Sequence, residues 1–117
     1  LNALGAFRAV QAALPALKAH AGTASIVLFS TVAVAQGFAS HASIGMAKGA
    51  VEGLMLSLAA ELAPKVRVNC IAPSLTKTPL AKALTSNEQM VAGIASLHAM
   101  QRLGEADDVA ALAAFLM

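Results

Sequence analysis

The sequence predicts an α/β fold with a parallel sheet. Residues 25–30 and 66–72 are apolar, β-branched runs, and a long helical pattern at residues 43–62 separates them. Such runs are typical of strands that are buried on both faces. A strand, a helix and a strand in that order form a right-handed parallel crossover. We therefore expect the loops that leave both strands to meet at one edge of the sheet, where open α/β folds bind ligands.

Composition is typical of a globular protein. Of the 117 residues, 58% are hydrophobic and 12% charged, and the chain contains neither Trp nor Tyr. The formal net charge of +2 comes from scattered Lys and Arg, which argues against nucleic-acid binding. Because Cys70 is the single cysteine, it cannot form an internal disulfide, and a reducing, cytoplasmic location is expected.

A membrane span is also weighed, because no charged residue occurs between Lys18 and Lys48. Polar side chains recur through this window and its β-branched half favours a buried strand, so we expect no span. No signal-peptide pattern is visible. Both ends of the chain fall inside helical patterns, so the sequence is expected to be the middle of a larger domain.

Apolar spacing and helix breakers predict the other elements. Residues 2–20 have the spacing of a helix, which Pro15 disturbs and Gly22 follows. The helix at residues 43–62 ends before Pro64, and residues 73–79 form the loop after the second strand. The segment around Gly37 is expected to be the loop after the first strand.

The last third of the chain is predicted to be helical. Thr85 and Glu88 have the spacing of a capping box, and Gly104 separates their helix from the last one. The first turn of the last helix has acids that suit a helix N-terminus: Glu105, Asp107 and Asp108. Since the histidines lack metal-ligand spacing, no metal site is expected, and His20 and His98 are expected to be surface or locally hydrogen-bonded residues.

Three segments together resemble the short-chain dehydrogenases/reductases. Residues 2–7 are similar to that family's Asn-Leu-x-Gly-x-Phe helix, and residues 102–110 to the segment that opens its last helix. Residues 68–78 are similar to the strand and Pro-Gly-x-x-x-Thr loop that hold the nicotinamide end of the cofactor. The resemblance implies that residues 1–117 are part of a doubly wound, Rossmann-like NAD(P)-binding domain. They lack the family's N-terminal Gly-rich half and its last strand.

The same resemblance implies a function and a set of site residues. It implies hydride transfer between NAD or NADP and a small carbonyl or alcohol substrate. Thr31 stands for the family serine that holds the substrate oxygen, Lys48 for the lysine that binds the cofactor and assists proton transfer, and Asn2 for the relay asparagine. The other residues implied to contact the cofactor are Pro73, Ser74, Thr76 and Thr78.

These residues also have ordinary structural interpretations. Lys48 is alternatively a solvated helix lysine, Asn2 a helix cap, and Thr31 a cap at the end of a strand. Thr78 is alternatively part of a turn before a proline. Ser74 stands where the family has glycine, and it fits there if its backbone avoids positive φ. Without a phosphate-binding turn, the chain alone is expected to bind dinucleotides poorly.

The family tyrosine, four residues before the helix lysine, is replaced here by Ile44, which has no proton to transfer. The sequence therefore leaves open an oxidoreductase with altered acid/base chemistry, a cofactor-binding or structural relative without catalysis, and an unrelated interaction or membrane module. His41 is a candidate proton donor, since it shares a face with Lys48 if the helix extends back that far. The alternative is that His41 only forms hydrogen bonds within its loop.

Small residues repeat every four positions along the central helix: Gly45, Gly49, Gly53 and Ser57. Glycine costs up to about 1 kcal/mol in a helix interior, so close approach by another helix is expected to offset it. The resemblance implies a homodimer or homotetramer through residues 1–20 and 43–62; the alternative is that this stripe seats a helix of the same chain. The opposite side is expected to cover the sheet with Ala47, Val51, Leu54, Leu58 and Leu62. Two strands leave unpaired edges, so the chain is not expected to be a stable monomer.

Overall fold

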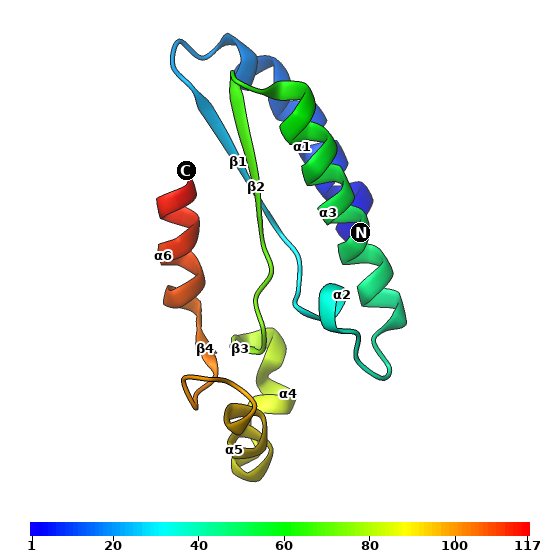
Figure 1. The fold of residues 1–117 in the computed structure, drawn as a ribbon, viewed down its shortest axis with the longest axis vertical. Helices are drawn as coiled ribbons and strands as arrows, with labels where there is room; N and C mark the ends of the chain where they lie inside the picture. The colour runs from blue at the N-terminus through cyan, green and yellow to red at the C-terminus, as the bar shows by residue number, and fades with distance from the viewer.

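The computed structural model describes all residues, 1–117, as two pairs of parallel strands with helices around them (Figure 1). The elements in chain order are α1 (Asn2–Ala19), β1 (Ala24–Phe29), α2 (Ala33–Gln36), α3 (Ala42–Leu62), β2 (Val66–Ile71), β3 (Thr76–Lys77), the 3-10 turn η1 (Pro79–Ala81), α4 (Lys82–Thr85), α5 (Glu88–Ser96), β4 (Gly104–Glu105) and α6 (Ala106–Leu116). The predicted α/β class is therefore confirmed.

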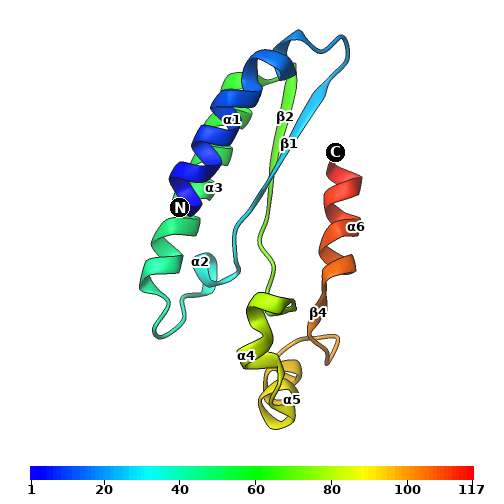
Figure 2. The same cartoon turned by 180° about the vertical axis from the view of Figure 1, so that it is seen from behind.

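The main sheet consists of β1 and β2, which are parallel and paired from Ala24 opposite Val66 to Phe29 opposite Ile71. Helix α3 connects them, as the order of apolar runs predicts. Helices α1 and α3 lie together on one side of the two strands, and α6 lies on the other side (Figures 1 and 2). Helices thus cover both faces of the strands, whose residues are buried or partly buried except Phe29 and Arg67. This agrees with the largely apolar strand sequences.

The core lies between α3 and the sheet. Val51, Leu58 and Leu62 of α3 are buried against Val66 and Val68 of β2, and Val66 is only 1% exposed. Each fully buried side chain of this size contributes roughly 1.5–3 kcal/mol to the hydrophobic stabilisation. The sheet-facing side of the central helix is thus the one that the sequence predicts.

Helix α6 is attached to the sheet at its C-terminal end. The Ser25 hydroxyl donates a hydrogen bond to the Leu116 carbonyl (2.9 Å), and Arg67 donates one to the Met117 carbonyl (3.0 Å). The N-terminus of α6 carries a capping box, in which the side chains of Glu105 and Asp108 each accept a backbone N–H from the other's position. The prediction that acids begin this helix is confirmed.

The capping box predicted from Thr85 and Glu88 is wrong. Asn87 caps α5, since its extended backbone lets its side-chain oxygen accept the Met90 N–H at 3.0 Å. Thr85 lies inside α4, where its hydroxyl donates to the Ala81 carbonyl at 3.1 Å. A helical backbone thus directs this hydroxyl to the preceding turn and away from the next helix.

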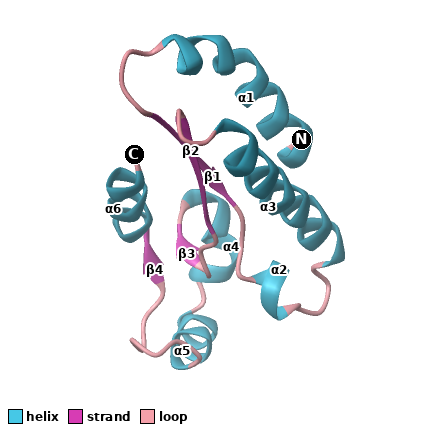
Figure 3. Cartoon of the chain, turned by 45° about the horizontal axis from the view of Figure 1, so that its top comes forward, coloured by secondary structure: helices cyan, strands magenta, loops and turns pink.

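Three short elements occur where the sequence predicts loops or a glycine that separates two helices. Helix α2 forms within the loop after β1, and the two-residue strands β3 and β4 form a small parallel pair beside the main sheet (Figure 3). Gly104 suits this pair, because a Cβ atom there would lie 3.0 Å from the Thr76 hydroxyl oxygen, so a larger residue would force the Thr76 side chain to shift. The glycine therefore allows the close contact of two segments that are far apart in sequence.

The fold is extended rather than compact. Its radius of gyration is 16.1 Å, whereas a compact domain of this length has about 13 Å. Large apolar side chains are exposed in α1, just after α5 and in α6, among them Leu4, Leu97 and Phe115. The structure contains no helix with both the length and the apolar character needed to cross a membrane.

Candidate functional site

The loops after β1 and β2 lie side by side at the carboxyl edge of the sheet. Beyond the last paired residues, Ser30 N–H donates to the Ile71 carbonyl at 2.7 Å and Val32 N–H donates to the Pro73 carbonyl at 3.2 Å. These bonds continue the ladder into both loops and place Thr31 next to the start of the loop after β2. The predicted meeting of the two loops is confirmed.

Lys48 lies at the end of β1, although it belongs to α3. Its Nζ donates a hydrogen bond to the Phe29 carbonyl at 2.9 Å. Thr31 lies two residues after Phe29 in the chain. Its hydroxyl oxygen accepts the N–H of Ala33, at the start of α2, at 3.3 Å. An ammonium group has three donors, so two N–H groups of Lys48 remain for a ligand. The structure thus brings Thr31 and Lys48 to the same strand end.

Glu52 is a polar residue of this region that the sequence analysis missed. One helical turn after Lys48, its carboxylate accepts a hydrogen bond from the buried Ser30 hydroxyl. Glu52 lines a cavity of about 310 Å³ together with Thr31, Gln36 and Cys70. Its spacing of four residues from Lys48 is the signal that points to the same helix face.

Cys70 is part of the same cavity wall. Burial raises the pKa of its thiol above the ordinary value, and the negative charge of Glu52 adds to the effect. The thiol therefore stays protonated at neutral pH and acts as a small apolar side chain, because the thiolate is the nucleophilic form. Cys70 is a free cysteine that is partly buried, whereas the sequence predicts a buried one.

Neither Asn2 nor His41 forms a hydrogen bond with Lys48. Asn2 is exposed in the first turn of α1, where Leu1 is the N-cap residue, and its side chain makes no hydrogen bond. The His41 Nδ1 bonds to the Ala39 carbonyl at 2.8 Å, and the ring stacks edge-on against Phe38. Because α3 begins at Ala42, the helical path needed for His41 to share a face with Lys48 does not reach it.

The loop after β2 holds the other predicted residues. Ser74 avoids positive φ, so its side chain is accommodated where the resembled family has glycine. The Thr76 hydroxyl donates to the Ser74 carbonyl at 3.0 Å. The Thr78 hydroxyl accepts the Ala81 N–H at 3.3 Å and thereby caps η1, as its structural interpretation expects. Pro73, Ser74 and Thr76 line a second cavity of about 380 Å³.

His98 closes this second cavity from the segment after α5. Its Nδ1 bonds to the Ile94 carbonyl and its Nε2 to the Ser74 hydroxyl oxygen, both at 2.8 Å. The first bond is the local hydrogen bond that the sequence analysis expects for His98. The second joins residues 24 positions apart, and no local pattern in the sequence indicates it.

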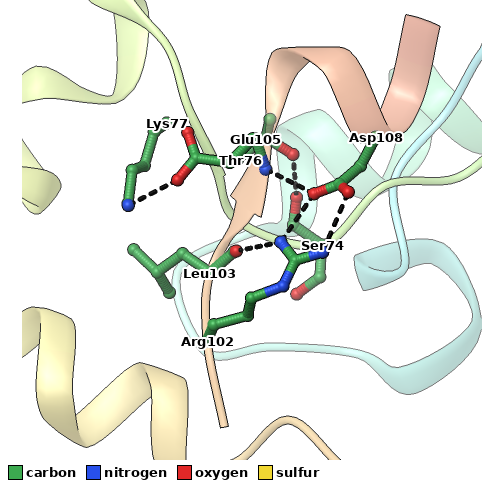
Figure 4. A network of polar contacts seen from close by, with 7 residues as sticks. All are labelled: Ser74, Thr76, Lys77, Arg102, Leu103, Glu105 and Asp108. Atoms are coloured by element: carbon green, nitrogen blue, oxygen red, sulfur yellow. Dashed lines mark hydrogen bonds and ion pairs between the residues drawn. The ribbon is translucent and has the colours of Figure 1, made fainter. Parts of the chain in front are cut away.

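Arg102 and Asp108, which line the second cavity, belong to a polar network that also contains Lys77 and Glu105 (Figure 4). Arg102 binds Asp108 through two parallel hydrogen bonds of 2.6 and 2.9 Å, and Lys77 pairs with Glu105 at 2.5 Å. The guanidinium group, followed by the Glu105 backbone N–H, holds the pKa of the Asp108 carboxyl well below its usual range. The same pairing raises the pKa of Arg102. The network joins the β3–β4 pair to the start of α6 and neutralises Arg102 beside the cavity.

The whole chain, residues 1–117, matches the family model described as enoyl-(acyl carrier protein) reductase. Over 92 residues it is 42% identical to tropinone reductase-like 3 of Erythroxylum coca, which covers 79% of this chain and 36% of that protein. A short-chain dehydrogenase/reductase structure from Brucella melitensis, a glucose/ribitol dehydrogenase, is similar with a TM-score of 0.89 and 34% identity, over 98% of this chain and 45% of that one. A tyrosine variant of ElxO with NADPH bound has a TM-score of 0.74 and 34% identity, over 92% and 42% of the two chains.

The chain therefore spans less than half the length of each of these proteins. The parallel sheet, the lysine at the strand end and the loop after β2 occur in a chain whose full length matches one family model. The Brucella melitensis structure, which covers 98% of this chain, is described as a short-chain dehydrogenase/reductase. This chain belongs to the short-chain dehydrogenase/reductase family.

Proposed function

We propose that the whole protein is an NAD(P)-dependent oxidoreductase that transfers a hydride between a nicotinamide cofactor and a small carbonyl or alcohol substrate. The observation that supports this most directly is the position of Lys48 at the carboxyl end of β1 beside Thr31. In an open α/β sheet this edge is where ligands bind. Family membership supports the same class of reaction.

The residues at this edge fit such a cofactor. Lys48 has two free N–H donors for ribose hydroxyl groups, because one donor is used by the Phe29 carbonyl. The Thr31 hydroxyl is suited to hold the substrate oxygen, and Pro73, Ser74 and Thr76 line the neighbouring cavity. When bound, the nicotinamide donates or accepts the hydride; Lys48 and Thr31 orient the groups that react.

Ile44 supports a second candidate function, a relative that binds the cofactor without catalysis. It lies half-buried in the first turn of α3, four residues before Lys48, and an isoleucine side chain neither gives nor takes a proton. The ElxO variant has phenylalanine in place of one tyrosine and is described with NADPH bound. Loss of a tyrosine hydroxyl in that protein is therefore compatible with dinucleotide binding, which makes binding and catalysis separable here.

The experiment measures both properties on the whole protein. Titration with NADH and with NADPH, followed by the change in nicotinamide fluorescence, tests binding. Absorbance of the reduced cofactor in the presence of a panel of ketones and aldehydes tests hydride transfer. Binding with turnover supports the oxidoreductase, binding without turnover supports the second candidate, and no binding of either dinucleotide overturns both.

We also propose that the protein is a homodimer or homotetramer through α1 and α3. The small-residue stripe of α3 is largely open, since a Cβ atom added at Gly45 or Gly53 meets no atom within 4 Å. Only Gly49 has a neighbour of the same chain, Val34 of α2, at 3.8 Å. The stripe therefore leaves room for the backbone of a second helix.

A further inference from the structure

Ser30 and Thr31 are consecutive hydroxyl residues just after β1, and their side chains have different partners. Ser30 is only 6% exposed, and its hydroxyl donates a hydrogen bond to the Glu52 carboxylate of α3. The Thr31 hydroxyl oxygen accepts the Ala33 N–H at 3.3 Å, and its own proton is donated to no group of the chain. The Ser30 proton is therefore committed to α3, whereas the Thr31 proton is free for a ligand oxygen.

Glu52 supplies the acceptor that the buried Ser30 hydroxyl needs. A buried hydroxyl without a partner is costly, and Ser30 has no other side-chain hydrogen bond. Glu52 forms no ion pair, so the Ser30 hydroxyl is the only hydrogen-bond partner of its carboxylate. It lies one helical turn after Lys48, on the same side of α3. This contact is therefore specific to two residues that are 22 positions apart.

The backbone on both sides of Thr31 is held by hydrogen bonds. The carbonyl of Phe29, two residues earlier, accepts from Lys48 at 2.9 Å, and Glu52 holds the residue directly before Thr31. The N–H of the residue directly after Thr31 donates to the loop after β2 at 3.2 Å. Glu52 is therefore the side chain of α3 that is bonded to a chain neighbour of Thr31.

Packing does not fix the Thr31 side chain by itself. Thr31 and Glu52 line the same cavity of about 310 Å³, and the wall between α3 and β2 is otherwise largely apolar. A close-packed interior would hold a side chain by contact on all sides, which a cavity does not. The hydrogen bond from Ser30 to Glu52 therefore restrains the chain beside Thr31 where packing is incomplete.

We propose that Glu52 is a positioning residue for Thr31. It holds the Ser30 hydroxyl and so fixes the end of the strand from which Thr31 contacts the substrate oxygen. This assignment rests on the proposed function, in which Thr31 holds that oxygen. Because Glu52 takes the Ser30 proton, Thr31 is left as the single hydroxyl donor of the pair. Glu52 itself touches neither the substrate nor the cofactor in this role.

Rates of carbonyl reduction by the whole protein test the role. Glu52→Leu removes the acceptor and is expected to lower kcat about ten- to a hundredfold, since small displacements of a positioned group have effects of this size. Glu52→Gln keeps a side-chain oxygen that accepts from Ser30 and is expected to recover most of the loss. The dissociation constant of the dinucleotide is expected to change less than about twofold in both variants, because the bond from Lys48 to Phe29 remains.

Ser30→Ala removes the same hydrogen bond from its other end. Its effect on kcat and that of Glu52→Leu are expected not to multiply in the double variant, because both remove one bond. Glu61→Leu is the matched control, since Glu61 is exposed on α3 and forms no side-chain hydrogen bond. Multiplying effects, or an equal loss of kcat in Glu61→Leu, overturn the inference while the proposed function stands. If Glu52→Leu does not fold, Ser30→Ala carries each measurement.

Methyl NMR of the whole protein with labelled threonine gives a readout that needs no cofactor or substrate. Thr31→Ser identifies the Thr31 signal, which is expected to shift in Glu52→Leu and in Ser30→Ala, and to shift less in Glu52→Gln. An unchanged signal in Glu52→Leu overturns the inference. If the wild type reduces no carbonyl compound, the proposed oxidoreductase falls, and the methyl signal alone decides whether Glu52 positions Thr31.

Discussion

The Nζ of Lys48 donates a hydrogen bond of 2.9 Å to the backbone carbonyl oxygen of Phe29, nineteen residues earlier in the chain. This bond joins α3 to the last residue of β1. One helical turn further, Glu52 accepts a hydrogen bond from the adjacent Ser30. Helix α3 therefore contacts the end of β1 from two successive turns, and one of these contacts holds the Lys48 ammonium group at the strand end.

We expect Lys48→Met in the whole protein to weaken dinucleotide binding at least tenfold, because an ammonium group with two free donors is lost. Loss of the bond to Phe29 is also expected to lower the free energy of unfolding by about 1 kcal/mol. Titration with the dinucleotide and urea denaturation measure the two effects. Lys82→Met is the control, since Lys82 is exposed on α4 and forms no side-chain hydrogen bond. Equal effects of the two substitutions would contradict a specific role for Lys48.

Ile44→Tyr is expected to raise the rate of carbonyl reduction at least tenfold, because a positioned general acid contributes about 10²–10⁴-fold. Ile44→Phe is the matched control, which adds the same ring without the hydroxyl. Steady-state rates of cofactor oxidation at saturating substrate measure the difference between the two variants. If tyrosine and phenylalanine have the same effect, the site is not arranged for proton transfer from this position.

His41→Ala is expected to change the rate less than twofold between about pH 5.5 and 8.5, the range in which histidine changes its charge. The reason is that the His41 ring bonds to the Ala39 carbonyl within its own loop and makes no hydrogen bond to Lys48. The pH profile of turnover for the wild type and the variant measures this. Loss of one arm of the profile in His41→Ala would instead identify His41 as the proton donor.

Asp108→Asn is expected to destabilise the protein at neutral pH and to have little effect in acid. The native pKa of Asp108 is lowered, first by Arg102 and then by the Glu105 N–H, so the native state favours the charged form. Its stabilisation is fully present above the unfolded pKa of about 3.9 and is lost as pH falls below that value towards the native pKa. Unfolding measured from neutral pH to about pH 2 should show the wild-type advantage disappearing only in this acidic window. The neighbouring Asp107, which forms no ion pair, is the control position.

Ser40→Gly is expected to stabilise the fold by about 0.5 kcal/mol. Ser40 has a φ of 63°, in the left-handed region that costs an L-residue about 1–2 kcal/mol, and the greater flexibility of unfolded glycine offsets part of the gain. Ser43→Gly, three residues later in the first turn of α3, is expected to destabilise by about 0.5 kcal/mol. Thermal or urea denaturation compares the two. If both substitutions change the free energy of unfolding in the same direction, the backbone at Ser40 is not strained.

Gly53→Leu is expected to disrupt the proposed homo-oligomer without disrupting the protomer. A side chain at this position meets no atom of its own chain within 4 Å, and leucine has a higher helix propensity than glycine. Gly93→Leu on α5 makes the same change at another open position and is the control. Sedimentation velocity of the whole protein measures the assembly state. An unchanged oligomer in Gly53→Leu would exclude the α3 stripe as the interface.

Much of the fold was predictable because it depends on local sequence. The β-branched runs predict β1 and β2 to within one residue at each end, and the apolar spacing predicts the buried side of α3. The parallel order of these elements then requires the loops containing Thr31 and Pro73 to meet, which the backbone hydrogen bond from Val32 to Pro73 bears out. These features need only side-chain periodicity and the chirality of the crossover.

Tertiary structure alone decided the contacts between distant segments. The pairing of β3 with β4 involves only two residues in each strand, which is too short for an alternating pattern to mark it. The bonds from Ser30 to Glu52 and from Ser74 to His98 join residues 22 and 24 positions apart. Their formation depends on the paths of the intervening loops. A polar residue has the same local pattern whether it faces solvent or a distant partner, so the sequence by itself determined the strands and the central helix, and packing determined which polar groups meet.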